Sequence, residues 1–193
     1  KYNFACVCYG NKYPVEYVQK LFMMVTRNTT IPNLNFYVFT DHVKMHKMVF
    51  GDNLNIIQFP EHDLDGWWNK MQLFHPDVQL EGTTLYMDLD VVITDNIDCF
   101  FTYKPEARFV GMNDFNPTTK QWNSSIMRFD QSMWHDKLWR RFRDDRTNLL
   151  RRFPGDQNLI SDFIKDSPGC VSFPDSWTQS YKWYDRSGTR YSR

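Results

Sequence analysis

The chain has 193 residues, with 23 basic and 23 acidic side chains and therefore no formal net charge. Hydrophobic residues make up 41% of the chain and aromatic residues 17%, which excludes a disordered or collagen-like protein. The neutral balance argues against a protein that binds nucleic acid through its phosphates. No apolar run reaches the roughly 20 residues of a transmembrane helix.

The four cysteines match neither a zinc pattern nor a disulfide scaffold. Cys6 and Cys8 lie two apart in an apolar stretch, so in a strand they would share one face. We interpret these two, together with Cys99 and Cys170, as small hydrophobic residues in a reducing compartment. This predicts a cytoplasmic protein, and peripheral attachment to a membrane stays open.

The first half of the chain alternates strand and helix patterns. Continuous apolar runs that end in polar or turn residues predict buried strands over 4–8, 36–39, 56–59 and 83–87. Pro14 opens a helix with apolar residues at three-to-four spacing, and residues 66–74 resemble a short aromatic helix. The alternation predicts an α/β fold with a mostly parallel twisted sheet flanked by helices, which binds ligands at the carboxyl ends of its strands.

The second half of the chain is less regular. Strands are predicted over 109–112 and 125–129, and a helical pattern runs over 131–150. Another helix begins around Gly155 and continues through Ile164. Because no linker, repeat or low-complexity stretch interrupts the chain, residues 1–193 are predicted to form a single compact domain.

An acidic pair, Asp88-Leu89-Asp90, follows the strand predicted at 83–87. In extended backbone, residues i and i+2 project to the same side, so both carboxylates could face one ion. Two carboxylates suit Mn²⁺ or Mg²⁺, which complete their coordination with substrate phosphates. The pattern therefore predicts a divalent metal site, and a polar loop between two strands is the structural alternative.

The acidic pair also resembles the motif of the haloacid-dehalogenase phosphatases, which Asp88-Leu89-Asp90-Val91-Val92 matches. In that family the first aspartate is a nucleophile and the second a general acid and base. The family places this pair on its first strand, whereas three predicted strands precede it here. The family also requires a later acidic motif. The nearest match in this chain is Gly155-Asp156 with Asp162, and its spacing is wrong. The phosphatase is therefore the weaker hypothesis.

The order of motifs along most of the chain resembles the GT-A glycosyltransferases, particularly the glycogenin and bacterial galactosyltransferase group. The resemblance rests on Tyr9-Gly10, Thr40-Asp41, Trp68-Asn69-Lys70, Asp88-Leu89-Asp90, Asn123-Ser124-Ser125-Ile126-Met127 and Gly155-Asp156-Gln157. It implies a GT-A, Rossmann-like fold in which residues 1–95 bind the nucleotide and residues 96–193 bind the sugar and the acceptor.

The same resemblance implies roles for individual residues. The metal ligands would be Asp88 and Asp90. The donor nucleotide-sugar would be held by Tyr9, Gly10, Asp41, Lys70, Asn123, Ser124 and Lys182. The residues nearest the transferred sugar would be Asp156 and Gln157, and an inverting reaction would take Asp114 or Asp156 as its base. Helix capping is an alternative role for Asp156.

The chain departs from the family pattern at two points. Ser125 replaces a glycine that lines the sugar site, and no histidine lies in the tail, where many relatives have a further metal ligand. Water or Asp175 could take that place. These departures motivate a second hypothesis, a catalytically silent nucleotide-sugar-binding module. We expect Trp67 and Trp68 to be core residues, with a platform for the substrate as the alternative role. The basic residues after Lys182 are expected to form a flexible lid.

The activity that the resemblance implies is metal-dependent transfer of a sugar from a nucleotide-diphosphate donor to an acceptor hydroxyl. Analogy favours UDP as the nucleotide and retention of configuration at the sugar. The residues do not identify the acceptor, which could be a glycan, a lipid-linked glycan or a protein.

Overall fold

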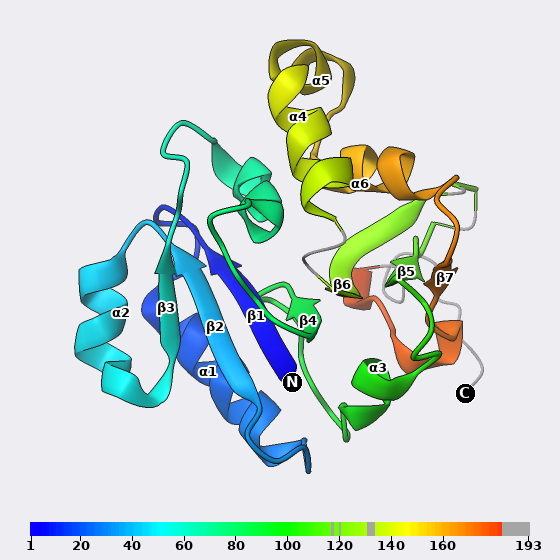
Figure 1. Ribbon diagram of the computed structural model, residues 1–193. Coiled ribbons are helices and arrows are strands. Elements are labelled where there is room, and N and C mark those ends of the chain that lie inside the picture. Colours follow the sequence, from blue (N-terminus) through cyan, green and yellow to red (C-terminus); the bar gives the residue numbers. More distant parts are fainter. Residues whose placement is uncertain (117, 120, 131–133, 183–193) are drawn as a thin grey trace.

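One sheet runs through the whole structure. The computed structural model describes residues 1–116, 118–119, 121–130 and 134–182. Within these residues the strands are β1 (Tyr2–Cys8), β2 (Asn35–Thr40), β3 (Asn55–Gln58), β4 (Thr83–Met87), β5 (Phe109–Asn113), β6 (Trp122–Asp130) and β7 (Cys170–Ser172). Their order in the sheet is β3-β2-β1-β4-β6-β5-β7 (Figure 1).

Most neighbouring strands run parallel. Strands β1 to β4 are parallel to one another, and β7 is parallel to β5. Strand β6 is antiparallel to both of its neighbours, β4 and β5. The predicted α/β fold with a mostly parallel twisted sheet is therefore confirmed.

Helices cover both faces of this sheet. The α-helices are α1 (Val15–Arg27), α2 (Val43–Phe50), α3 (Asp98–Thr102), α4 (Arg141–Asp144), α5 (Arg146–Arg152) and α6 (Asp156–Ile164). A 3₁₀ helix of nine residues lies at Gly66–Phe74, and single 3₁₀ turns lie at Gly51–Asn53 and Asp175–Trp177. A π-helical turn at His135–Arg140 precedes α4. Among the described residues, none of these helices is long and apolar enough to cross a membrane.

The core has two parts, one on each face of the sheet, because side chains alternate along a strand. In β1, Ala5 and Val7 pack with the Gly66–Phe74 segment, α4 and α6. Phe4, Cys6 and Cys8 face the other way and pack with α1 and α3. The prediction that the two cysteines share one buried face is confirmed, and their thiols are free.

Several elements differ from the sequence expectation. The short helix predicted over residues 66–74 is present as a 3₁₀ helix, with every residue from Asn69 to Phe74 buried. The helix predicted over 131–150 is divided into the π turn, α4 and α5, with a break at Asp145, whose φ and ψ of −128° and 25° are not helical. Residues 131–133 lie outside the described residues.

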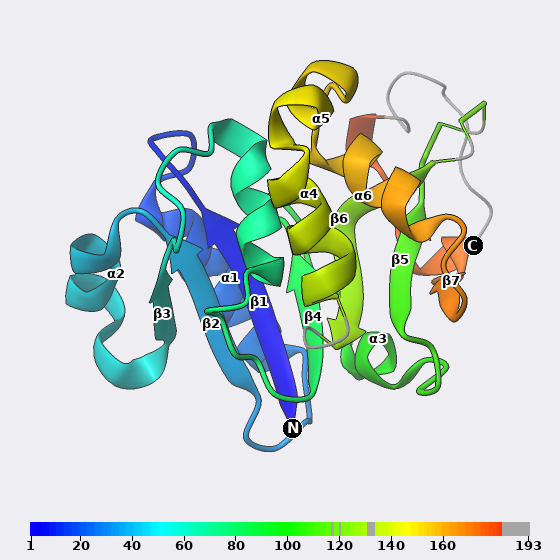
Figure 2. The ribbon, with the colours of Figure 1, turned by 45° about the horizontal axis from the view of Figure 1, so that its top comes forward.

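The carboxyl ends of β1, β2 and β4 open at the same edge of the sheet, because these strands are parallel and adjacent. The residues that follow them are Tyr9, Asp41 and Asp88. Figure 2 shows the Gly66–Phe74 segment (teal) beside α4, over this face of the sheet. The sheet edge and this segment together form the walls of the candidate site.

Candidate active site

A cavity of about 210 Å³ opens at the carboxyl edge of the sheet. Seven of the predicted site residues line it: Tyr9, Lys70, Asp88, Asp90, Ser124, Asp156 and Gln157. They come from the end of β1, the Gly66–Phe74 segment, the turn after β4, strand β6 and the start of α6. The fold thus brings together residues that are as much as 148 positions apart in the printed sequence, from Tyr9 to Gln157.

Lys70 is the centre of the site. Its Nζ lies 3.1 Å from Asp88 Oδ1 and 3.0 Å from Asp156 Oδ2, and it donates a 2.9 Å hydrogen bond to Ser124 Oγ. The residue is only 7% exposed. Burial alone would lower the pKa of Lys70, but the two carboxylates outweigh it and raise that pKa. A permanent positive charge therefore sits between the end of β4 and the start of α6.

Asp88 is held as a carboxylate. Its side chain is 26% exposed, and Oδ1 accepts a hydrogen bond from the hydroxyl of Tyr86 as well as the ion pair with Lys70. Burial raises the pKa of Asp88, but Lys70 and the hydrogen bonds from Tyr86 and Ser125 lower it by more, so the pKa lies below its ordinary value. The site keeps this group negatively charged.

Asp90 is exposed and lines the same cavity. Its Oδ2 accepts a 2.9 Å hydrogen bond from the hydroxyl of Tyr13. Between the two aspartates, the side chain of Leu89 is buried in the core. The acidic pair lies in a turn, in which the Val91 N–H donates to the Asp88 carbonyl, and not in the extended backbone that we expected. The turn nevertheless leaves both carboxylates lining one cavity.

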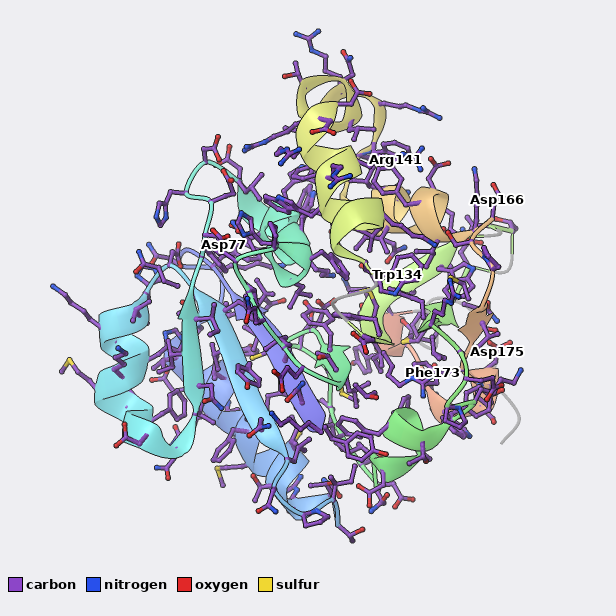
Figure 3. All side chains as sticks on the ribbon, viewed as in Figure 1. Asp77, Trp134, Arg141, Asp166, Phe173 and Asp175 are labelled. Carbon is purple, nitrogen blue, oxygen red and sulfur yellow. The ribbon has the colours of Figure 1, made fainter. Side chains whose placement is uncertain are left out.

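The two carboxylates fit a divalent cation, because oxygen ligands are those that Mn²⁺ and Mg²⁺ prefer. No group of three His, Cys, Asp or Glu side chains suited to a metal occurs in the part of the chain that the structure describes. Asp175 accepts a 2.9 Å hydrogen bond from Asn113 and lies beside β7 (Figure 3). An ion held by Asp88 and Asp90 would complete its coordination with further oxygen ligands, such as substrate phosphates and water.

A hydrogen-bond network continues from Lys70 to the start of α6. Asp156 is 6% exposed, and its Oδ2 accepts a 2.9 Å hydrogen bond from Ser124 Oγ. Gln157 accepts from the Ser124 N–H at 3.3 Å and donates to Asp114 Oδ2 at 3.0 Å. Asp156 is in the first turn of α6 and Gly155 is the cap, so the carboxylate faces the helix dipole favourably without capping the helix.

The other predicted site residues lie around the cavity or away from it. The N–H of Gly10 donates to both carboxylate oxygens of Asp41, at 3.2 and 3.0 Å. Asn123 accepts a 2.8 Å hydrogen bond from the Ser125 N–H. Lys182 is exposed and does not line the cavity. The predicted lid falls on 183–193, outside the described residues.

The residues that line the cavity but were not among the predicted site residues include Lys12, Tyr13, Tyr86 and Trp67. Tyr86 could have been found, because it precedes Asp88 by two positions and side chains two apart in a strand share a face. The expectation that Trp67 is a core residue is wrong, since it is 52% exposed. Trp68 does pack in the core, where its ring stacks on Phe142 at 6.0 Å.

The charges of this site predict a pH profile of stability. Because the pKa of Asp88 is lowered in the folded state, this group stabilises the fold at pH values above 3.8, its ordinary pKa. The contribution is lost as the pH falls toward the folded-state pKa. Because the pKa of Lys70 is raised in the folded state, this group stabilises the fold at pH values below 10.5, its ordinary pKa, and the contribution is lost at higher pH. Urea unfolding at a series of pH values should show a shallower acid slope in Asp88→Asn than in wild type. Asp52→Asn is the control, because it changes an exposed aspartate outside the cavity. Its acid slope should equal that of wild type.

Comparison with known proteins adds the fold family. No family model and no curated protein matches the chain. Among solved structures, the glycosyltransferase GlyE of Streptococcus pneumoniae TIGR4 superposes with a TM-score of 0.74, at 14% identity over 97% of this chain and 49% of GlyE. LgtC, a galactosyltransferase in complex with donor and acceptor sugar analogues, superposes with a TM-score of 0.64, at 11% identity over 98% of this chain and 84% of LgtC.

The chain has the same fold as these two glycosyltransferases. An active-site mutant of LgtC gives the same result, with a TM-score of 0.66 at 11% identity. The chain spans about half the length of GlyE. The predicted GT-A fold is thereby confirmed. The phosphatase hypothesis has no support in this glycosyltransferase fold, because the acidic pair follows β4 and no aspartate ends β1.

Proposed function

We propose that the protein is a metal-dependent glycosyltransferase, which moves a sugar from a nucleotide-diphosphate donor, UDP by analogy, to an acceptor hydroxyl. The observation that carries this proposal is the meeting of Asp88 and Asp90 with Lys70 and Asp156 in one cavity at the carboxyl edge of the sheet. GlyE and LgtC share this fold, and LgtC has been crystallised with donor and acceptor sugar analogues.

The charged residues suit a site for a leaving diphosphate. A divalent ion on Asp88 and Asp90 would neutralise the pyrophosphate and the charge that it gains as the sugar leaves. Lys70 adds a buried positive charge whose position is fixed by Asp88 and Asp156. Since such preorganised charges need no rearrangement during the reaction, they stabilise the transition state efficiently. Tyr13 and Tyr86 orient the two metal-binding carboxylates.

The end of β1 is the proposed nucleotide side of the site. Gly10 has a φ of +53°, a backbone conformation that favours glycine, and no atom would lie within 4 Å of a Cβ there. The glycine is therefore needed for conformation, which turns its N–H onto the carboxylate of Asp41. In our proposal Tyr9 stacks on the base and Asp41 binds the ribose.

The start of α6 is the proposed sugar side. Gln157 is held in place by Ser124 and Asp114, so its amide is fixed next to the cavity. Both candidates for a general base have one oxygen engaged: Asp156 Oδ2 pairs with Lys70, and Asp114 Oδ2 accepts from Gln157. A base needs an oxygen directed at the acceptor hydroxyl. We keep the retaining reaction on analogy, with a protein that mainly positions and shields the reactants.

Thermal shift with nucleotide-sugars tests the proposal. UDP-, GDP- and CDP-sugars are compared with and without Mn²⁺, because a ligand that binds the folded state raises the melting temperature by mass action. We expect UDP-sugars with Mn²⁺ to give the largest shift, equivalent to about 2.7 kcal/mol at 100 times the dissociation constant. A folded protein that no donor stabilises in the presence of Mn²⁺ would contradict the proposal.

The silent binding module stays the second candidate, because Ser125 lines the cavity where the family pattern has glycine. A side chain there narrows the approach of the backbone to the sugar. Measured release of free sugar or transfer to an added glycoside separates the two candidates. A module that only binds would show the thermal shift with UDP-sugars and Mn²⁺ but no turnover of the donor.

A further inference from the structure

Trp67 stands at the mouth of the cavity with 52% of its surface exposed. A single exposed hydrophobic residue is ordinary on a protein surface. This one, however, lines a cavity whose neighbouring walls are the polar side chains of Lys70, Asp156 and Gln157. Exposure of an indole forgoes the stabilisation that burial would provide. An apolar plate beside converging polar groups is typical of a ligand site.

The backbone on either side of this indole is held in place. Gly66 has a φ of +57°, which favours glycine and reverses the chain just before Trp67. Trp68 is anchored in the core, where its ring stacks on Phe142 with an interplanar angle of 15°. Asn69 donates hydrogen bonds to the carbonyls of Leu64 and Gly66, at 2.9 and 3.0 Å. Because the backbone on both sides is fixed, little order must be gained when a ligand binds.

The position of Trp67 is on the sugar side of the cavity. Its Nε1 lies 3.3 Å from where a Cβ on Gly155 would be, so the indole rests against the residue that caps α6. The next residues are Asp156 and Gln157. Gly155 has an extended backbone, with a φ of −168°, so glycine is not required there for conformation. The missing side chain instead makes room for the indole.

We propose that Trp67 is a stacking platform for a pyranose ring, and that the acceptor is therefore a saccharide. The C–H face of a pyranose is apolar and packs on an aromatic face, while its hydroxyls can reach polar groups such as Gln157. The exposed rim suits the acceptor, since the donor pyrophosphate belongs at Asp88 and Lys70 on the buried floor. The role of this saccharide as the acceptor rests on the proposed function, whereas the binding of a saccharide at Trp67 does not.

The indole N–H signal of Trp67 in an NMR spectrum of isotope-labelled protein gives a direct test. Loss of one indole signal in Trp67→Phe assigns it. Lactose, methyl β-galactoside and methyl β-glucoside are then titrated separately from UDP with Mg²⁺. We expect at least one saccharide to move the Trp67 signal and UDP to move it little. Trp67→Ala should weaken saccharide binding roughly tenfold, as expected for a lost aromatic contact, and leave UDP affinity unchanged.

Met48→Ala is the matched control, because Met48 is an exposed hydrophobic residue on α2 that does not line the cavity. This variant should bind the saccharides as wild type does. If UDP moves the Trp67 signal and none of the three saccharides does, the indole stacks on a base and the inference is overturned. The inference also fails if neither kind of probe moves the signal. If a saccharide moves it and UDP does not bind at all, the saccharide platform stands and the proposed function fails.

Discussion

Asp90→Ala is expected to abolish the stimulation of donor binding by Mn²⁺ and to leave the fold intact. Asp90 is exposed, and its hydrogen bond is to the hydroxyl of Tyr13 at the cavity wall, so its removal leaves no buried charge. With one of two carboxylate ligands gone, UDP affinity in Mn²⁺ should fall about 100-fold or more, whereas UDP affinity without metal should change little. Isothermal titration with and without Mn²⁺ measures both.

Two variants make this result specific. Asp52→Ala removes an exposed carboxylate in the Gly51–Asn53 turn, outside the cavity, and should behave as wild type. Tyr13→Phe keeps both carboxylates but loses the hydrogen bond that orients Asp90, so it should lie between wild type and Asp90→Ala. Unchanged UDP affinity in Asp90→Ala, with and without Mn²⁺, would show that the acidic pair does not bind the donor through a metal.

The framework of the site was predictable because buried parallel strands leave a strong local pattern. Continuous apolar runs located β1, β2 and β4, and the rule that ligands bind at carboxyl ends singled out Tyr9, Asp41 and Asp88. Each of these residues immediately follows its strand, so an error of one residue would have mattered little. Strand ends are therefore where local sequence carries the most information about a site.

Elements whose apolar residues face outward escaped prediction. In α2 the buried residues are His46 and Phe50, whereas Met45, Met48 and Val49 are exposed, so apolar spacing does not mark its inner face. Strand β7 has three residues, too few to show alternation. Trp67 and Trp68 are adjacent and chemically identical, and only the long-range contact of Trp68 with Phe142 decides which one is buried.

The Lys70 network also depends on distant parts of the chain. The resemblance to the GT-A family identified each of four residues as a site residue separately: Lys70, Asp88, Ser124 and Asp156. Their union in one cluster follows from the pairing of β4 with β6 and from the packing of α6 against β6. No local pattern encodes that one ammonium group lies within 3.1 Å of both carboxylates.

Lys70→Met is expected to destabilise the protein by about 3 kcal/mol or more, the range for removing one partner of a buried ion pair. Met has a similar length and fills the same space, so the loss comes from charge and not from a cavity. The variant leaves Asp88 and Asp156 without their shared cation, and Asp156 is only 6% exposed. Urea denaturation at neutral pH measures the free energy of unfolding.

If the loss in Lys70→Met is electrostatic, three further results are expected. The double variant Lys70→Met/Asp156→Asn should recover part of the loss, because one unpaired carboxylate has become neutral. The deficit should shrink as the pH falls, because protonation neutralises the carboxylates that have lost their cation. Mn²⁺ should stabilise Lys70→Met more than wild type, since an ion at Asp88 replaces a missing positive charge. If the double variant is no more stable than Lys70→Met at neutral pH, the two aspartates do not depend on Lys70 for their charge balance.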